Sequence, residues 1–135
     1  MDLESYSTLE CIFVVLLIMS PAYLANTIAV LTGGKYPIDQ GKLHSDGNRI
    51  LGDGKTWSGL IGGTIGGMIL GYGLIVFIHE YIGEFLNLSI LFLLSFGALF
   101  GDMTASFYKR RQNLQRGDKF AILDMYDFII MSLLL

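Results

Sequence analysis

Long apolar runs separate short polar segments along this chain, and the runs predict membrane-spanning helices. The first run, residues 11–34, has no charged residue, and neither do the second and third runs, residues 56–78 and 85–101. A helix needs about 20 apolar residues to cross a bilayer, and the first two runs reach that length. The third run is shorter but strongly apolar. A last run, residues 128–135, is too short to cross by itself.

These runs predict an all-α fold, a polytopic membrane helical bundle that forms a single integral membrane domain over residues 1–135. We expect at least three complete transmembrane helices and a C-terminal fourth helix that is incomplete in this chain. Pro21 lies inside the first run and should kink its helix. Asn26 is a polar residue in the same run, suited either to a hydrogen bond between helices or to a ligand contact at the membrane surface.

Glycine repeats along the second run predict close helix packing. Small residues spaced four apart let a neighbouring backbone approach closely, and the run contains two such rows: Gly59, Gly63, Gly67 and Gly71 in one, Gly62 and Gly66 in the other. The partner helix belongs either to the same chain or to a second subunit, in which case the protein would be a homodimer.

The distribution of positive charge predicts the topology. All nine Lys and Arg residues lie within residues 35–55 and 109–119. Two apolar runs separate these segments, so both should emerge on one face, and the bias of Lys and Arg toward cytoplasmic loops makes that face the cytoplasm. We expect cytoplasmic loops at about 32–57 and 103–127, with the acidic N-terminus outside a multi-pass protein of the cell membrane. A pI near 5.2 argues against nucleic-acid binding.

The first loop contains a sequence that resembles part of a phosphate-binding motif. Gly54-Lys55-Thr56 matches the end of a Walker A motif, but Arg49 stands where the motif requires its first glycine, and no apolar strand precedes it. A P-loop is therefore rejected. Lys55 and Thr56 still open the second predicted helix, whose free N–H groups could bind an anion; the alternative is a helix cap with an extended lysine.

The second loop combines carboxylates and cations at helical spacing. One helix face would carry Asp102, Ser106, Lys109 and Arg110, while Asp124 and Asp127 are three residues apart on another. Carboxylates at a membrane boundary are costly unless they are paired or bind cations. Two alternatives remain: a Mg²⁺ site that shares the metal with phosphate oxygens, or simple ion pairs with the neighbouring basic residues Arg110, Arg111, Arg116 and Lys119.

A family resemblance rests on these residues. The run from Gly101-Asp102 through Ser106 to Lys109-Arg110, followed by Lys119, Asp124 and Asp127, resembles the signature of the CDP-diacylglycerol synthases. Further segments resemble their archaeal relatives, the CDP-archaeol synthases: residues 21–26, 37–39, 46–49 and 52–57. The chain departs from the family at Ser58, where an Arg is usual, and in the short fourth run.

The resemblance implies transfer of CMP from CTP to 2,3-di-O-geranylgeranylglyceryl phosphate, with Mg²⁺ as cofactor and with CTP, the lipid phosphate and membrane lipids as partners. It implies that the catalytic, metal-binding residues are Asp102, Asp124 and Asp127. The implied nucleotide- and phosphate-binding residues are Asp53, Lys55, Thr56, Ser106, Lys109, Arg110 and Lys119. The residues implied for the lipid phosphate, or for supporting positions behind the site, are Asn26, Asp46 and Arg49.

Three other functions remain as alternatives from the sequence. A CDP-alcohol phosphotransferase would share the Asp46-Gly47 pair, but the required downstream aspartates four residues apart are missing. A small membrane glycerol-phosphate acyltransferase would share the glycine-rich loop but needs no aspartate cluster. A small transporter would need polar residues in mid-membrane, where the chain offers only Asn26 and scattered Ser and Thr residues.

Overall fold

Three long helices make up the described part of the protein. The computed structural model describes residues 7–77 and 87–114, with α1 at Thr8–Leu31, α2 at Trp57–Phe77 and α4 at Leu88–Arg111. All three are long and apolar enough to cross a membrane. The described residues contain no strand, only two isolated β-bridges in the segment between α1 and α2. The all-α prediction is confirmed for these residues, and the predicted fourth helix lies outside them.

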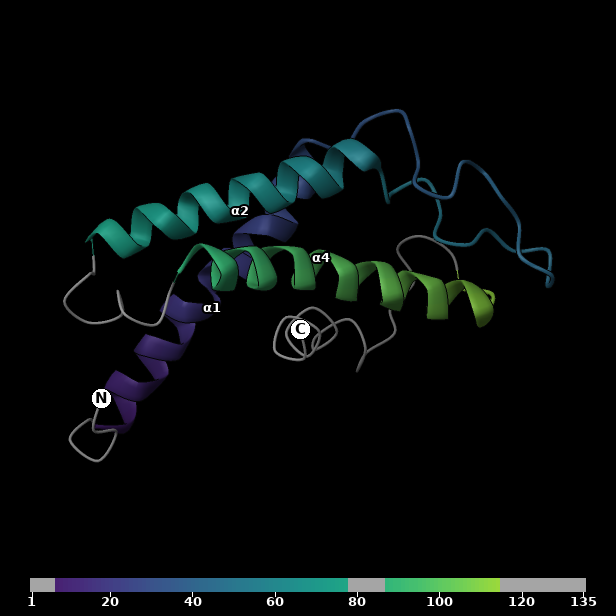
Figure 1. Ribbon diagram of the computed structural model, residues 1–135. Coiled ribbons are helices and arrows are strands. Elements are labelled where there is room, and N and C mark those ends of the chain that lie inside the picture. The colour runs from purple at the N-terminus through teal and green to yellow at the C-terminus, as the bar shows by residue number, and fades with distance from the viewer. Residues whose placement is uncertain (1–6, 78–86, 115–135) are drawn as a thin grey trace.

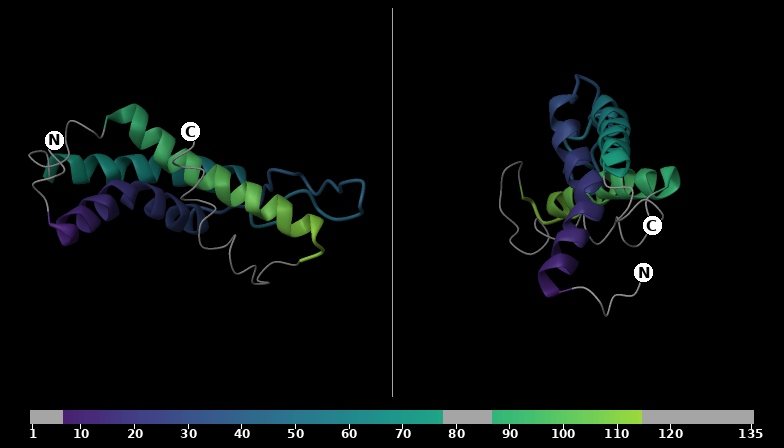
Figure 2. Two further views of the ribbon diagram at one scale, coloured as in Figure 1. Left: turned by 90° about the horizontal axis from the view of Figure 1, so that it is seen from below. Right: turned by 90° about the vertical axis from the view of Figure 1, so that its left-hand side faces the viewer.

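The helices pack side by side with one irregular segment, residues 32–56, at one end of the bundle (Figure 1). Helix α2 leads away from this segment and α4 leads back toward it, so the two helices are antiparallel. Helix α1 crosses both of them at an angle (Figure 2). The end of α1, the start of α2 and the last turns of α4 therefore come together at the end of the bundle where residues 32–56 lie.

Capping residues mark the start of α1, three residues before the predicted run, and the start of α4, inside the predicted run. Ser7 and Glu10 form a capping box at the start of α1, and the Asn87 side chain accepts the N–H of Ile90 at the start of α4. Helix α4 then continues ten residues beyond the apolar run, to Arg111. Residues 103–111, predicted as the start of a loop, are helical. At 1.5 Å per residue the helix is about 36 Å long, more than the ~30 Å hydrocarbon core requires.

Helix α1 contains Pro21 at a buried position and changes direction along its length (Figure 2). Proline cannot donate the hydrogen bond to the carbonyl four residues earlier. The carbonyl of Leu17 instead accepts the Ser20 hydroxyl at 2.6 Å. The predicted kink is thus stabilised by a neighbouring side chain, as a polar group in a membrane requires.

The glycine rows of α2 pack against the other two helices of the same chain. A Cβ on Gly63 would lie 2.7 Å from the Ala25 carbonyl and 2.9 Å from Leu99 Cδ1. A Cβ on Gly67 would lie 2.6 Å from the Ser95 hydroxyl, and the neighbouring row faces α1. Of the two alternatives from the sequence, the internal partner is correct. The glycine rows therefore give no support to the homodimer.

Replacing Gly63 by Ala should lower the free energy of unfolding by about 1–3 kcal/mol, because the new methyl group overpacks a backbone contact. Gly73 is the matched control in the same helix, since nothing lies within 4 Å of its missing Cβ. Gly73→Ala should be neutral or slightly stabilising. Circular dichroism of both variants during SDS titration in detergent micelles measures the difference. Equal effects would show that the close approach at Gly63 does not determine stability.

Candidate functional site

The segment between α1 and α2 folds around one buried carboxylate, Asp39. Its Oδ2 accepts the backbone N–H groups of Leu51 at 3.0 Å and Gly52 at 2.9 Å, and its Oδ1 accepts the N–H of Gly41 at 3.1 Å. The Arg49 guanidinium donates to both oxygens, with Nη2 2.7 Å from Oδ1 and Nε 3.2 Å from Oδ2. Five donors thus converge on one side chain that is fully buried.

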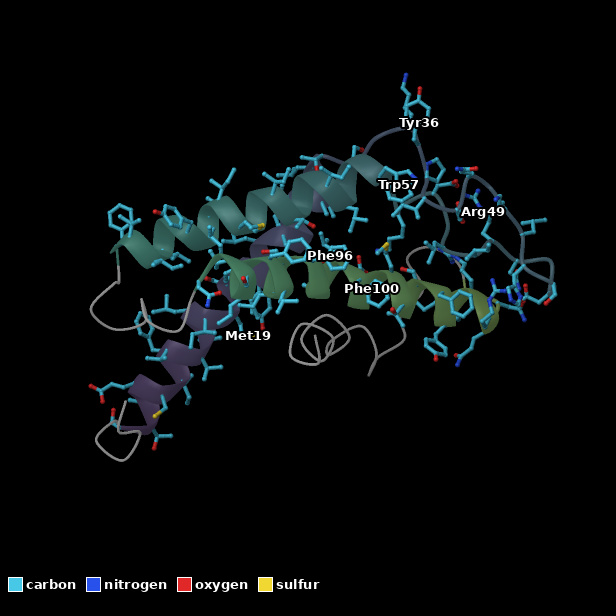
Figure 3. The ribbon with its side chains drawn as sticks, viewed as in Figure 1. Met19, Tyr36, Arg49, Trp57, Phe96 and Phe100 are labelled. Carbon is cyan, nitrogen blue, oxygen red and sulfur yellow. The ribbon has the colours of Figure 1, made fainter. Side chains whose placement is uncertain are left out.

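The charge state of Asp39 follows from these contacts. Burial alone would raise the pKa of Asp39, but the Arg49 guanidinium and the three backbone N–H groups more than offset burial and hold the pKa well below its ordinary value. Arg49 also pairs with Asp53, at 2.8 Å between Nη1 and Oδ1. Arg49 lies in the irregular segment beyond the start of α2 (Figure 3). The Arg49 guanidinium thus joins the buried carboxylate of Asp39 to the exposed carboxylate of Asp53.

A small pocket opens where the segment meets the three helices. It has a volume of about 60 Å³ and brings together Asn26 of α1, Lys55 and Thr56 before α2, and Asp102 of α4. The Lys55 ammonium forms an ion pair with Asp102 Oδ2, and the two residues are 47 positions apart in the chain. Asn26 thus lies at the same pocket as a cation and a carboxylate. Asn26, Lys55 and Asp102 come from three separate parts of the chain, so the tertiary fold creates the pocket.

The size of the pocket limits what it can hold. Sites for whole small-molecule ligands typically occupy about 300–1,000 Å³, so the pocket formed by the described residues is smaller than a site for a whole nucleotide. It can admit a phosphate oxygen or a metal ion at its polar wall. An apolar hollow of about 330 Å³ adjoins it, because Ile38 and Met103 line both spaces.

Thr56 has a structural role in addition to its place at the pocket. Its hydroxyl oxygen accepts the N–H of Gly59 and the N–H of Gly34, both at 3.2 Å, and the residue is buried. Thr56 therefore caps α2 and attaches the end of α1 to the start of α2. This is the helix cap considered from the sequence, and phosphate binding by Thr56 stays a prediction.

The last turns of α4 present the other predicted side chains. Ser106 donates its hydroxyl to the Asp102 carbonyl at 2.8 Å, a bond within the helix. Arg110 Nη1 donates to the Leu114 carbonyl at 2.5 Å, and a Cβ on Gly52 would lie 3.1 Å from Arg110 Nη2. Gly52 has a φ of 95°, a backbone conformation that favours glycine. A glycine is thus required both by the turn and by the close approach of Arg110.

The structure separates some residues that the sequence grouped together. Asp46 pairs with Arg111 at 2.9 Å near the tip of the segment and does not line the pocket. Arg49 pairs with Asp39 and Asp53, a contact that sequence spacing alone did not suggest. Lys109 and Arg110 lie on the last turn of α4 beyond the pocket lining. Three predicted residues lie outside the described part of the chain: Lys119, Asp124 and Asp127.

Asp39 and Arg111 are the two residues that sequence reasoning missed as site-forming residues. Asp39 had a signal, since it follows Pro37-Ile38 in a glycine-rich loop where a carboxylate often accepts backbone N–H groups. Arg111 had none, because it lies one position past the predicted helix face and only the fold brings the loop to it.

The residues present are compatible with a magnesium ion. The described ranges contain no cluster of three His, Cys, Asp or Glu side chains that could hold a metal by themselves. Mg²⁺, however, usually takes only one or two carboxylates together with phosphate oxygens and water. Asp102 has a side chain that is 40% exposed and places a carboxylate at the pocket. This donor set fits a metal that arrives with a phosphorylated ligand.

Comparison with known proteins assigns the chain to a family. The CarS-like family, described as CDP-archaeol synthase, matches residues 8–135. A CDP-archaeol synthase of Methanocorpusculum labreanum is 49% identical over 87% of this chain and 68% of its own length. One from Archaeoglobus fulgidus is 44% identical over 94% of this chain and 75% of its own length.

A solved structure agrees with the sequence comparison. It is described as an intramembrane enzyme for archaeal membrane lipids biosynthesis, and it superimposes with a TM-score of 0.78 over 91% of this chain and 75% of that chain, at 36% identity. The fold, the membrane helices and the sequence thus lead to one assignment. The chain belongs to the CDP-archaeol synthase family of membrane enzymes.

Proposed function

We propose that this enzyme transfers CMP from CTP to 2,3-di-O-geranylgeranylglyceryl phosphate, an isoprenoid-ether lipid phosphate, and so forms CDP-archaeol and pyrophosphate. One observation carries the proposal beyond the family assignment. The pocket at the end of the bundle combines Lys55, Asp102 and Asn26 from three elements, next to an apolar hollow. A charged phosphate and an apolar chain can therefore meet at this end of the bundle.

The reaction balances without a covalent enzyme intermediate. An oxygen of the lipid phosphate forms a bond to the α-phosphorus of CTP, and the bond from that phosphorus to the bridging oxygen of the β-phosphate breaks. Pyrophosphate leaves with the bonding electrons. The attacking oxygen is already anionic, so no dedicated base is required. Such chemistry depends on positioning and on stabilising charge.

The residues of this chain would supply both the positioning of the substrates and the stabilisation of charge. Lys55 would bind phosphate oxygens at the pocket wall, with Lys109, Arg110 and Lys119 holding the rest of the triphosphate. Asp53 would close the site from the loop, and Asn26 would contact the lipid phosphate at the membrane surface. Asp102 would hold Mg²⁺ together with Asp124 and Asp127. When bound, the metal neutralises charge on the phosphates.

The apolar hollow supports a position for the lipid. Its walls come from Leu51 of the loop and from Phe100, Thr104 and Phe107 of α4, besides the two shared residues. On the same helix Phe92, Phe96 and Phe100 stack in succession, with ring centroids 5.4 and 6.2 Å apart. Phe96 and Phe100 lie along α4 in Figure 3. An isoprenoid chain could follow this aromatic row toward the pocket.

The proposal is tested with purified protein in detergent, radiolabelled CTP, Mg²⁺ and the isoprenoid-ether lipid phosphate. We expect a labelled lipid product and one pyrophosphate per turnover. Parallel reactions with ATP, GTP and UTP test the base, and a diacylglycerol phosphate tests the lipid. Absence of a labelled lipid with CTP and every lipid phosphate would contradict the proposal.

The same proposal places the pocket on the cytoplasmic face. On a background in which the single cysteine is removed by Cys11→Ser, cysteines introduced at Gln40 and Asn113 should react with a membrane-impermeant reagent only from the cytoplasmic side. A cysteine at Glu80 should react only from the other side. Reaction of positions 40 and 113 from opposite sides would contradict the topology.

A further inference from the structure

Arg111 joins the tip of the loop to the end of α4. Its Nη1 donates to Asp46 Oδ1 at 2.9 Å, and its Nη2 donates to the carbonyl of Arg49 at 2.6 Å. The guanidinium carbon lies 5.0 Å from the centroid of the Phe107 ring, and the side chain is only 18% exposed. Planar geometry, several donors and stacking on a ring are properties that Lys cannot reproduce.

Two further contacts lie beside Arg111. Asn48 Nδ2 donates to Asn113 Oδ1 at 2.7 Å. The His44 ring packs edge-on against Phe107, with centroids 6.0 Å apart. Residues 44–49 therefore dock on a short stretch of the chain, residues 107–113. Of these three contacts, the one through Arg111 is the most buried and the only one that carries charge on both sides.

The docked tip is connected to the pocket through hydrogen bonds. Arg111 holds the carbonyl of Arg49, and the Arg49 guanidinium holds Asp39 and Asp53. Asp39 in turn fixes the N–H of Gly52, three residues before Lys55. Each step joins one part of the loop to the next, so a continuous series of hydrogen bonds runs from the tip to the residues beside the pocket.

We propose that Arg111 is a positioning residue, which docks the loop on α4 and thereby places Asp53 and Lys55. It lies at the tip of the loop, away from the pocket lining, and acts through Arg49 and Asp39. The proposal rests on the proposed function, in that CMP transfer is one of its two readouts. Without Arg111 the tip loses its buried contact, and a displacement of about 1 Å at a reacting group can slow a reaction roughly 100-fold.

The test combines reversible cross-linking with activity. Asn48→Cys and Asn113→Cys are introduced on the Cys11→Ser background, and a short bifunctional methanethiosulfonate then joins the two thiols until a reducing agent releases them. Asn113 has a φ of 59°, so a cysteine there is strained. The parent with both cysteines and an intact Arg111 controls for that strain. Arg111→Ala and Arg111→Lys are compared with this parent, and Lys42→Ala, an exposed change on the same loop, is the matched control.

In substrate-free protein, Arg111→Ala should slow cross-linking at least tenfold relative to the parent, Arg111→Lys should slow it less, and Lys42→Ala should leave it unchanged. Arg111→Ala should also lower kcat/KM for CTP by roughly 10- to 100-fold. Cross-linking this variant to completion should restore most of the rate, and reduction should remove the gain.

Two results would overturn the proposal: cross-linking of Arg111→Ala at the parent rate, or a slow variant whose activity does not rise once the loop is cross-linked. A wild-type protein that transfers no CMP contradicts the proposed function instead. In that case the cross-linking rates, which need no substrate, still decide whether Arg111 docks the loop.

Discussion

Lys55→Met should reduce CMP transfer by about 30- to 700-fold while the protein stays folded. The Lys55 ammonium lies at the pocket, paired with Asp102 and with a side chain that is 20% exposed. Deleting a desolvated charge partner costs about 2–4 kcal/mol. Since the proposed substrate is a triphosphate, the lost interaction is with phosphate charge, and no other cation lines the pocket within the described ranges. Initial rates against CTP concentration in one detergent measure the effect.

A charge swap separates catalysis from structure at this pair. Lys55→Asp combined with Asp102→Lys keeps an ion pair between the same two positions. The thermal unfolding midpoint of the double variant should therefore exceed that of either single variant and lie close to that of the wild type. Transfer should not return, because the cation then projects from α4 and the carboxylate from the loop. Lys42→Met, exposed on the same loop, should change the rate less than twofold. Recovery of transfer in the swapped protein would mean that the pair acts only as a structural bridge.

Asp39→Asn should lower the free energy of unfolding by about 3–5 kcal/mol, the cost of breaking a buried ion pair from one side. The new amide would also point a donor at backbone N–H groups that now donate to Asp39. We expect faster hydrogen exchange at Leu51 and Gly52 and a lower thermal unfolding midpoint. Asp53→Asn is the matched control on the same guanidinium. Its carboxylate is 75% exposed, so its loss should cost less than about 1 kcal/mol.

The contribution of Asp39 to the free energy of unfolding should decrease as pH falls. The pKa of Asp39 is lower in the folded protein than its ordinary value near 3.9. The stability it contributes is therefore fully present above about pH 4 and is lost as pH falls toward the folded pKa. The gap in unfolding free energy between wild type and Asp39→Asn should narrow below pH 4. A gap that stays constant down to pH 2 would contradict the assigned charge.

Helix prediction from this sequence succeeded where a local rule applied. Three long apolar runs, two of membrane-spanning length and one shorter, located all three described helices, because a bilayer requires a continuous apolar helix surface. The ends were harder to place. The start of α1 is marked in the sequence by the Ser7–Glu10 capping box. The end of α4 is not marked by the fall in hydrophobicity, because the helix continues through Asp102 to Arg111.

The sequence also contained the residue types of the candidate site but not their pairings. Lys55 and Asp102 were both singled out, yet their contact spans 47 positions and exists because the start of α2 packs beside the end of α4. Arg49 was assigned either to the lipid phosphate or to a supporting position behind the site, and its observed partners, Asp39 and Asp53, could not be read from the sequence.

The sequence by itself determined the membrane class, the number and place of the described helices, and the family, since each depends on composition or on motifs read along the chain. The tertiary structure alone decided three things: that the glycine rows pack inside the chain, that Asp39 organises the loop, and that Arg111 docks it. The physical reason is that close packing and buried ion pairs join positions far apart in sequence. Their partners are fixed only when the helices have crossed and brought them within hydrogen-bonding distance.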